Sequence, residues 1–131
     1  MTGRLVFVRR ITRAMLRAEP EARFVFGDNV ARRGLGGQAK EMRGEPNAIG
    51  VVTKWRPNSA AQDFFSDDDP DIQSAVEKDL RKVTDFLGGG FTVYFPSDGI
   101  GAGLSELPTR APKLHQYITD YVADLAKRFP E

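Results

Sequence analysis

The sequence has no cysteine and a single histidine, His115, among its 131 residues. The lack of cysteine excludes disulfide bonds, thiolate metal sites and a cysteine nucleophile, and one histidine excludes a histidine-rich metal centre. Long hydrophobic runs are missing as well, because the N-terminal segment has only four consecutive apolar residues, at positions 5–8, before Arg9. We therefore expect neither a signal peptide nor a membrane-spanning segment, and a cytoplasmic location is the default prediction.

An excess of charge of one sign is also absent. The chain has 19 Lys and Arg against 18 Asp and Glu, which gives a formal net charge of +1. This balance excludes the strongly basic field of a protein that coats DNA. Hydrophobic residues make up 40% of the chain and charged residues 28%, a mixture typical of a folded protein. The length predicts one domain, over residues 1–131.

Four short segments rich in β-branched and aromatic residues predict buried strands. These are residues 5–8, 23–26, 48–52 and 91–95. Apolar residues at helical spacing predict long helices at residues 72–87 and 111–129, capped by Asp69 and Thr109, and shorter ones at residues 10–19 and 37–42. Strands that alternate with helices indicate an α/β fold whose sheet is at least partly parallel.

Three of these predicted strands run directly into loops of small and polar residues. The loops cover residues 27–39, 53–55 and 96–103. In open α/β sheets, ligands bind beyond the carboxyl ends of the strands. If the three strands are parallel neighbours, we expect the loops to form one crevice.

Glycines in two of the loops indicate what the crevice binds. One group is Gly34, Gly36 and Gly37, and the other is Gly99, Gly101 and Gly103. Bare backbone before a helix can point its N–H groups at an anion, so two such loops favour a diphosphate ligand. The alternative is that these glycines only make tight turns.

The order Gly34-x-Gly36-x-x-Ala39 also satisfies a loose dinucleotide-binding fingerprint. That fingerprint expects the glycines immediately after the strand, whereas residues 27–33 intervene here. It also expects an acidic residue at the end of the next strand, where this chain has Lys54. An NAD-dependent oxidoreductase is therefore the weaker interpretation.

Two segments taken together resemble a known family. They are FVFGDNVARRGLGGQAKEMRGEPNAIGVVTK at residues 24–54 and SDGIGAGLSEL at residues 97–107. In this order they resemble the macrodomains, which bind ADP-ribose, and are most similar to the lysine-dependent ADP-ribosyl glycohydrolases and to small phage-encoded macrodomain-like proteins. The resemblance implies a three-layer α/β/α sandwich with a mixed, partly parallel central sheet.

The resemblance also implies roles for individual residues. Lys54 stands where these hydrolases keep a catalytic lysine that acts on the anomeric carbon of the ribose. Ser105 stands where some members carry an acid that releases the intermediate, and Asp98 lies across the glycines as an alternative carboxylate. The implied ligand-binding residues are Gly27, Asp28, Asn29, Gly34, Gly36, Gly37, Gln38, Ala39, Thr53, Ser97, Gly99, Ile100, Gly101, Ala102, Gly103 and Leu104.

The implied function is recognition of ADP-ribose, and more specifically its removal from a macromolecule, either a DNA base or an acidic side chain. The alternative is a binder that does not catalyse, either a reader of ADP-ribosylated targets or a sponge for a nucleotide derived from NAD. The expected partners are ADP-ribose or an ADP-ribosylated macromolecule, with no membrane. No metal and no cofactor are predicted, because the acidic run at residues 67–71 fits helix capping better than metal binding.

Overall fold

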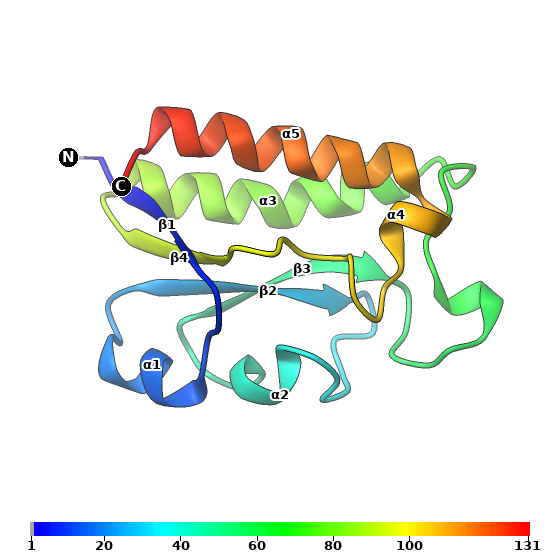
Figure 1. Ribbon diagram of the computed structural model, residues 1–131, viewed down its shortest axis with the longest axis horizontal. Coiled ribbons are helices and arrows are strands. Elements are labelled where there is room, and N and C mark those ends of the chain that lie inside the picture. The colour runs from blue at the N-terminus through cyan, green and yellow to red at the C-terminus, as the bar shows by residue number, and fades with distance from the viewer. Residues whose placement is uncertain (1) are drawn as a thin grey trace.

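The computed structural model describes residues 2–131 and is an α/β fold around one four-stranded sheet (Figure 1). The strands are β1 (Arg4–Val8), β2 (Arg23–Asn29), β3 (Ala48–Lys54) and β4 (Thr92–Pro96). Their order across the sheet is β1-β4-β2-β3, and all three pairs are parallel. The expectation of a mixed sheet is therefore wrong. Each strand is followed by a helical crossover before the next one, so every strand returns in the same direction.

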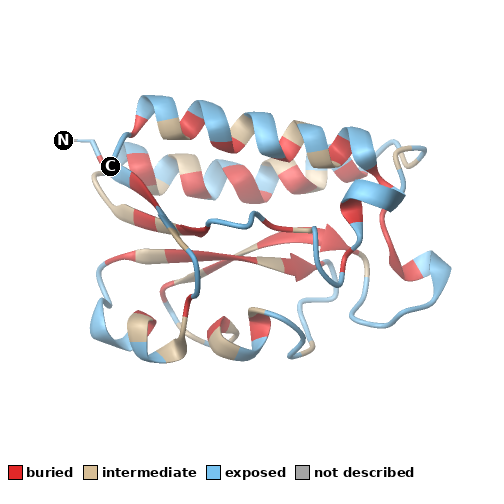
Figure 2. Ribbon diagram, viewed as in Figure 1, coloured by how far each residue is buried: buried red, intermediate tan, exposed pale blue. Residues whose placement is uncertain are grey.

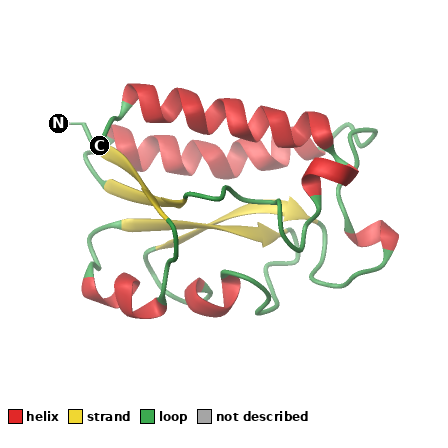
Figure 3. Cartoon of the chain, viewed as in Figure 1, coloured by secondary structure: helices red, strands yellow, loops and turns green. Residues whose placement is uncertain are grey.

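Helices cover both faces of the sheet (Figures 1 and 3). They are α1 (Arg13–Ala18), α2 (Ala39–Met42), α3 (Ile72–Gly88), α4 (Leu107–Arg110) and α5 (Pro112–Arg128), with a short 3₁₀ turn at Ala61–Asp63. The long helices α3 and α5 lie on one face, whereas α1 and α2 lie on the other. No helix within residues 2–131 is long and apolar enough to cross a lipid bilayer.

Strand β2 is buried along most of its length (Figure 2), and its side chains alternate between two separate cores. Phe24 and Phe26 pack with Leu16 and Met42 on the face of α1 and α2. Val25 points to the opposite face and packs among the apolar residues of α3 and α5. Because both faces of the central strands are covered, residues 24–26 of β2 are apolar without alternation, as the prediction of a buried strand required.

The predicted N-caps of the two long helices are wrong. Thr109 lies inside α4, and the N-cap of α3 is Asp71 rather than Asp69. The capping that does occur reaches across the fold, because the Asp67 carboxylate accepts hydrogen bonds from the N–H groups of Lys113 and Leu114 at 2.9 and 3.0 Å. An acid near the start of α3 thus caps α5.

The free edge of β3 is closed by two charged side chains instead of another strand. Asp79 of α3 accepts a hydrogen bond from the backbone N–H of Val52 at 3.0 Å. Arg32 donates to the carbonyl of Gly50 at 3.1 Å and to both oxygens of Asp79 at 2.9 and 2.8 Å. Asp79 is only 1% exposed. This pair satisfies outward-facing backbone groups that would otherwise template strand addition.

Replacing Asp79 with alanine is expected to lower the free energy of unfolding by about 2–3 kcal/mol, because charge-assisted hydrogen bonds and the bond to Val52 lose their acceptor. Urea denaturation measures this change. The control is Asp124→Ala, which removes an exposed ion pair with Arg128 and should cost less than about 0.5 kcal/mol. Similar losses in the two variants would contradict the role of Asp79 at the sheet edge.

Candidate functional site

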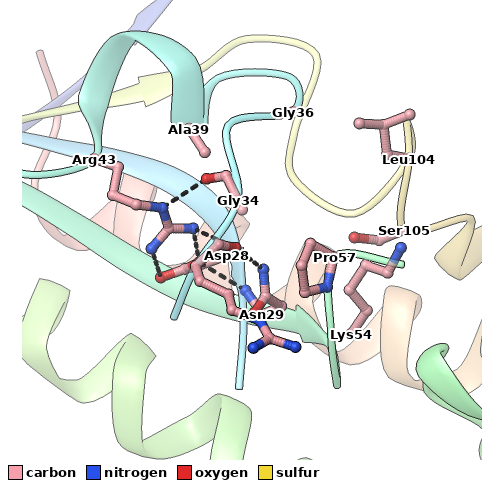
Figure 4. Close-up of a pocket in the computed structure, with 12 residues that line it drawn as sticks. Asp28, Asn29, Gly34, Gly36, Ala39, Arg43, Lys54, Pro57, Leu104 and Ser105 are labelled. Atoms are coloured by element: carbon pink, nitrogen blue, oxygen red, sulfur yellow. Dashed lines mark hydrogen bonds and ion pairs between the residues drawn. The ribbon is translucent and has the colours of Figure 1, made fainter. Parts of the chain in front are cut away.

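Two adjoining cavities lie at the carboxyl edge of the sheet, where β2, β3 and β4 end. The first, of about 80 Å³, is bordered by the ends of β2 and β3 and by the loop after β2 (Figure 4). The second, of about 240 Å³, is bordered by the loop after β4. Gly27, Gly36, Leu104 and Ser105 line both. Together the two cavities bring together every predicted site residue except Ser97.

Unpaired backbone N–H groups are concentrated in the two glycine loops. Within the described residues 2–131, none of the N–H groups of residues 33–38 and 100–105 donates a hydrogen bond to another protein group. Residues from both loops line the second cavity. Successive free N–H groups form a concave surface that favours anions, so this cavity is suited to a phosphate or diphosphate.

Arg43 and Asn29 hold the loop after β2 in the orientation that leaves these N–H groups free. Arg43 donates from Nε to the carbonyl of Gly34 at 2.7 Å and from Nη2 to that of Arg33 at 3.2 Å. Asn29 donates from Nδ2 to the same Arg33 carbonyl at 2.7 Å. Since the carbonyl oxygens face these side chains, their partial negative charge is kept from the anion-binding surface.

Asp28 balances the charge of the arginines. Its carboxylate pairs with Arg43 and Arg32 and accepts the backbone N–H of Asn29 at 2.8 Å. Asp28 is 6% exposed and lines the first cavity. The proposed contact of this side chain with a ligand stays a prediction, but the structure shows that its oxygens are already engaged within the protein.

Asn29 presents an acceptor without a partner. Its Oδ1 is buried and accepts no hydrogen bond from the described residues, and the residue as a whole is only 6% exposed. Asn29 lines the first cavity and pairs in the β2–β3 register with Lys54, at the end of β3. A buried acceptor without a hydrogen bond costs free energy. A ligand that donates a hydrogen bond to this oxygen would recover that free energy on binding.

Lys54 is buried at the end of β3, with 6% of its surface exposed, and is not a solvated surface lysine. Its Nζ donates to the backbone carbonyl of Asn58 at 2.8 Å and lies 4.3 Å from the ring centroid of Phe64. Burial lowers the pKa of Lys54 from its ordinary value of 10.5, and the negative charges of Asp63 and Glu106 oppose this shift. A lysine with a lowered pKa is more often neutral and is then a nucleophile.

Ser105 lies at the boundary of the two cavities. Its Oγ is 2.6 Å from the Oγ1 of Thr53, and both side chains are buried. Asp98 is exposed and lines the second cavity, but not the first, where Lys54 lies. The structure therefore places Ser105 with Lys54 and Asp98 with the glycines of the loop after β4.

A third cavity, which the sequence did not predict, adjoins the second. It measures about 310 Å³ and is lined largely by apolar side chains of β1, β4 and α5, including Phe7, Phe95, Ile118 and Val122. Phe7 is 44% exposed and meets Phe95 edge to face, with 6.1 Å between the ring centroids. Ser97, the predicted site residue absent from the other two cavities, lines this one. No signal in the sequence joins residue 7 to α5, because only tertiary packing brings them together.

Residues 6–121 match the model of a family described as a family of unknown function, DUF7831. The chain belongs to this family. No curated protein and no solved structure matches the chain. The matched region includes the three strand ends and every residue that lines the first two cavities.

The burial of Lys54 predicts how the stability of this DUF7831 protein depends on pH. Below the lowered pKa the amine is charged in both states, and burial makes that charge less favourable in the folded than in the unfolded protein, which costs stability. That cost disappears as the pH rises through the folded-state pKa toward 10.5. Wild type should therefore gain stability relative to Lys54→Met between neutral pH and pH 10, as measured by urea denaturation at several pH values. A difference that is constant or falls with pH would contradict the shift, and Lys78→Met on the exposed face of α3 is the control.

Proposed function

We propose that this DUF7831 protein recognises ADP-ribose through a macrodomain-like site and acts as an ADP-ribosyl glycohydrolase. The observation that carries the proposal is the row of three adjoining cavities, each with a different chemistry. The first offers an unpaired acceptor and a buried amine, the second offers free N–H groups, and the third offers apolar walls. These match a ribose, a diphosphate and an adenine base in the order in which ADP-ribose joins them.

The second cavity supports the diphosphate assignment because it combines two loops with free N–H groups. No lysine or arginine side chain lines it, so the backbone itself is the source of positive potential. Gly99 and Gly101 have φ values of +82° and +84°, a backbone conformation that glycine adopts without strain.

The third cavity supports the position of the base. Phe7 and Phe95 offer aromatic surface, Ile100 and Val122 offer aliphatic surface, and His115 adds a polar group. An apolar pocket with a few polar groups is the usual site for a planar heterocycle. It shares Asp98, Gly99 and Ile100, among others, with the second cavity, so one ligand can extend across both.

The fold is consistent with the same proposal. Helices on both faces of the sheet agree with the three-layer macrodomain-like arrangement, although the sheet is all parallel rather than mixed. A dinucleotide-binding Rossmann site fits less well, because the glycine loop leads into α2, which has only four residues, and not into a long helix at the end of a strand. A cytoplasmic location is part of this proposal.

Lys54 supports hydrolysis, because a buried amine with a lowered pKa can act as a nucleophile toward a ribose in the first cavity. In this step the neutral amine bonds to the anomeric carbon as the glycosidic bond to the macromolecule breaks and the leaving group takes up a proton. Water then displaces the amine and releases free ADP-ribose. The target would be ADP-ribose attached to DNA or to an acidic side chain. A non-catalytic binder is the second candidate, favoured by Ser105 at the position where some of the hydrolases that the sequence resembles carry an acid. The amine also donates a hydrogen bond to the Asn58 carbonyl, and this bond would have to break before Lys54 attacks.

The recognition of ADP-ribose is tested by calorimetry with ADP-ribose, AMP and NAD. We expect ADP-ribose to bind more tightly than AMP, because AMP lacks one phosphate and the terminal ribose. Gly36→Val should weaken ADP-ribose binding at least about tenfold, because its side chain would intrude between the glycine loops. A Cβ at Gly36 meets only the exposed, flexible Leu104, so the fold should persist, whereas one at Gly101 would meet the buried Leu107 at 2.3 Å.

Gly88→Val is the matched control, since a Cβ at Gly88 has no neighbour within 4 Å and the residue lies at the far end of α3. The proposal is wrong if millimolar ADP-ribose neither produces heat nor raises the melting temperature of the wild-type protein. Normal binding by Gly36→Val would show that the glycine loops do not contact the ligand.

Hydrolysis is tested with Lys54→Ala. We expect turnover of ADP-ribosylated DNA or of glutamate-linked ADP-ribosyl protein to fall at least about a hundredfold, whereas the affinity for ADP-ribose changes only a few-fold. Mass spectrometry detects both the product and a covalent lysine adduct. Lys78→Ala serves as the control on an exposed surface. Tight ADP-ribose binding by wild type with neither product nor adduct would favour the binder.

A further inference from the structure

We propose that Ser105 is a specificity-determining residue whose hydroxyl acts only as a hydrogen-bond acceptor toward the ligand. The end of the site beside Lys54 then selects a neutral sugar with free hydroxyl groups and rejects a phosphate, despite the lysine. This inference rests on the proposed function, because it assigns which end of ADP-ribose enters the first cavity.

A short chain of hydrogen bonds fixes the direction in which Ser105 donates. Thr53 Oγ1 lies 3.2 Å from the backbone carbonyl oxygen of Asp28, which can only accept, so Thr53 is the donor of that bond. Its only proton is then used. In the 2.6 Å contact between the two hydroxyls, Ser105 must therefore donate to Thr53. If Thr53 donated to Ser105 instead, it could no longer donate to the Asp28 carbonyl, and one hydrogen bond would form instead of two. That direction is therefore disfavoured.

Ser105 consequently has no hydroxyl proton left for a ligand, and its side chain offers the cavities only oxygen lone pairs. Asn29 also lines the first cavity, and its buried Oδ1 is a second acceptor, without a hydrogen-bond partner among the described residues. Two acceptors in one small cavity favour a group with two donors, such as the vicinal hydroxyls of a ribose. They repel phosphate oxygens, which carry negative charge and cannot donate.

Two of the three cationic residues that line this cavity are engaged within the protein, and the third, Arg33, is exposed to solvent. Lys54 is the side chain that would otherwise attract a phosphate, but its Nζ donates to the Asn58 carbonyl and lies over the Phe64 ring. Arg43 is engaged by Asp28 and by the carbonyls of Arg33 and Gly34. Of the twelve residues with free N–H groups, nine line the second cavity, on the other side of Ser105, and five line the first. Ser105 thus marks the border between a sugar and a phosphate.

The test is a comparison of ADP-ribose with ADP, which lacks the terminal ribose. Ser105→Ala should weaken ADP-ribose about tenfold, the loss of one hydrogen bond, and leave ADP unchanged. Thr53→Val should act in the same direction, because it frees the Ser105 proton to point at the ligand. The double variant should lose no more than Ser105→Ala alone, and Thr53→Ser, which keeps the hydroxyl, should restore most of the affinity that Thr53→Val loses. Ser74→Ala, on the exposed surface of α3, is the control.

Calorimetry gives both affinities for each variant, and circular dichroism verifies that each is folded. Equal losses for ADP-ribose and ADP in Ser105→Ala would place Ser105 in the phosphate site and overturn the inference while leaving the proposed function intact. Additive effects of Thr53→Val and Ser105→Ala would do the same, because they would show that the two hydroxyls are not coupled. Failure of the wild-type protein to bind either ligand would instead overturn the proposed function.

Discussion

The buried carboxylate of Asp28 is the interaction on which the candidate site depends. It holds Arg43, which in turn holds the carbonyls of Arg33 and Gly34, and it contacts Arg32, which closes the edge of β3 through Asp79. The carboxylate occupies space that only glycine leaves open, since a Cβ at Gly50 would lie 2.6 Å from its Oδ2. One charge therefore links the loop after β2 to the edge strand and to α3. Removing a single partner from such a network leaves the others with unpaired charge.

Local patterns in the sequence were sufficient for the strands and the long helices. All four strands were predicted, but β2 and β3 continue three and two residues past their predicted ends, to Asn29 and Lys54. Residues such as Gly27 and Asp28 have low strand propensity, which made the segment resemble a loop. Parallel pairing between the two strands overrides that propensity and pairs Asn29 with Lys54. The sequence alone does not reveal this pairing, because it depends on which strands become neighbours.

Local sequence patterns predicted where the candidate site lies, but not which side chains contact one another there. Glycine loops after strands indicate where ligands bind in α/β folds, and the loops do meet at one edge. Arg43 lies 15 residues from Asp28, and Asp67 caps a helix that begins 45 residues later, so neither contact follows from local spacing. The aromatic cavity was missed because Phe7 reads only as a residue of a buried strand, whereas its ring lies at the open edge of the sheet.

The three cavities draw their walls from residues 7 to 123, which is nearly the whole chain. No fragment containing a single loop can therefore reproduce the site, and the unfolded chain has no partial version of it. A ligand that spans the cavities binds only the native state, and it shifts the folding equilibrium of the entire domain by mass action. Bound ligand therefore adds to the resistance of every strand and helix to unfolding at once, by an amount that grows with the ligand concentration relative to the dissociation constant.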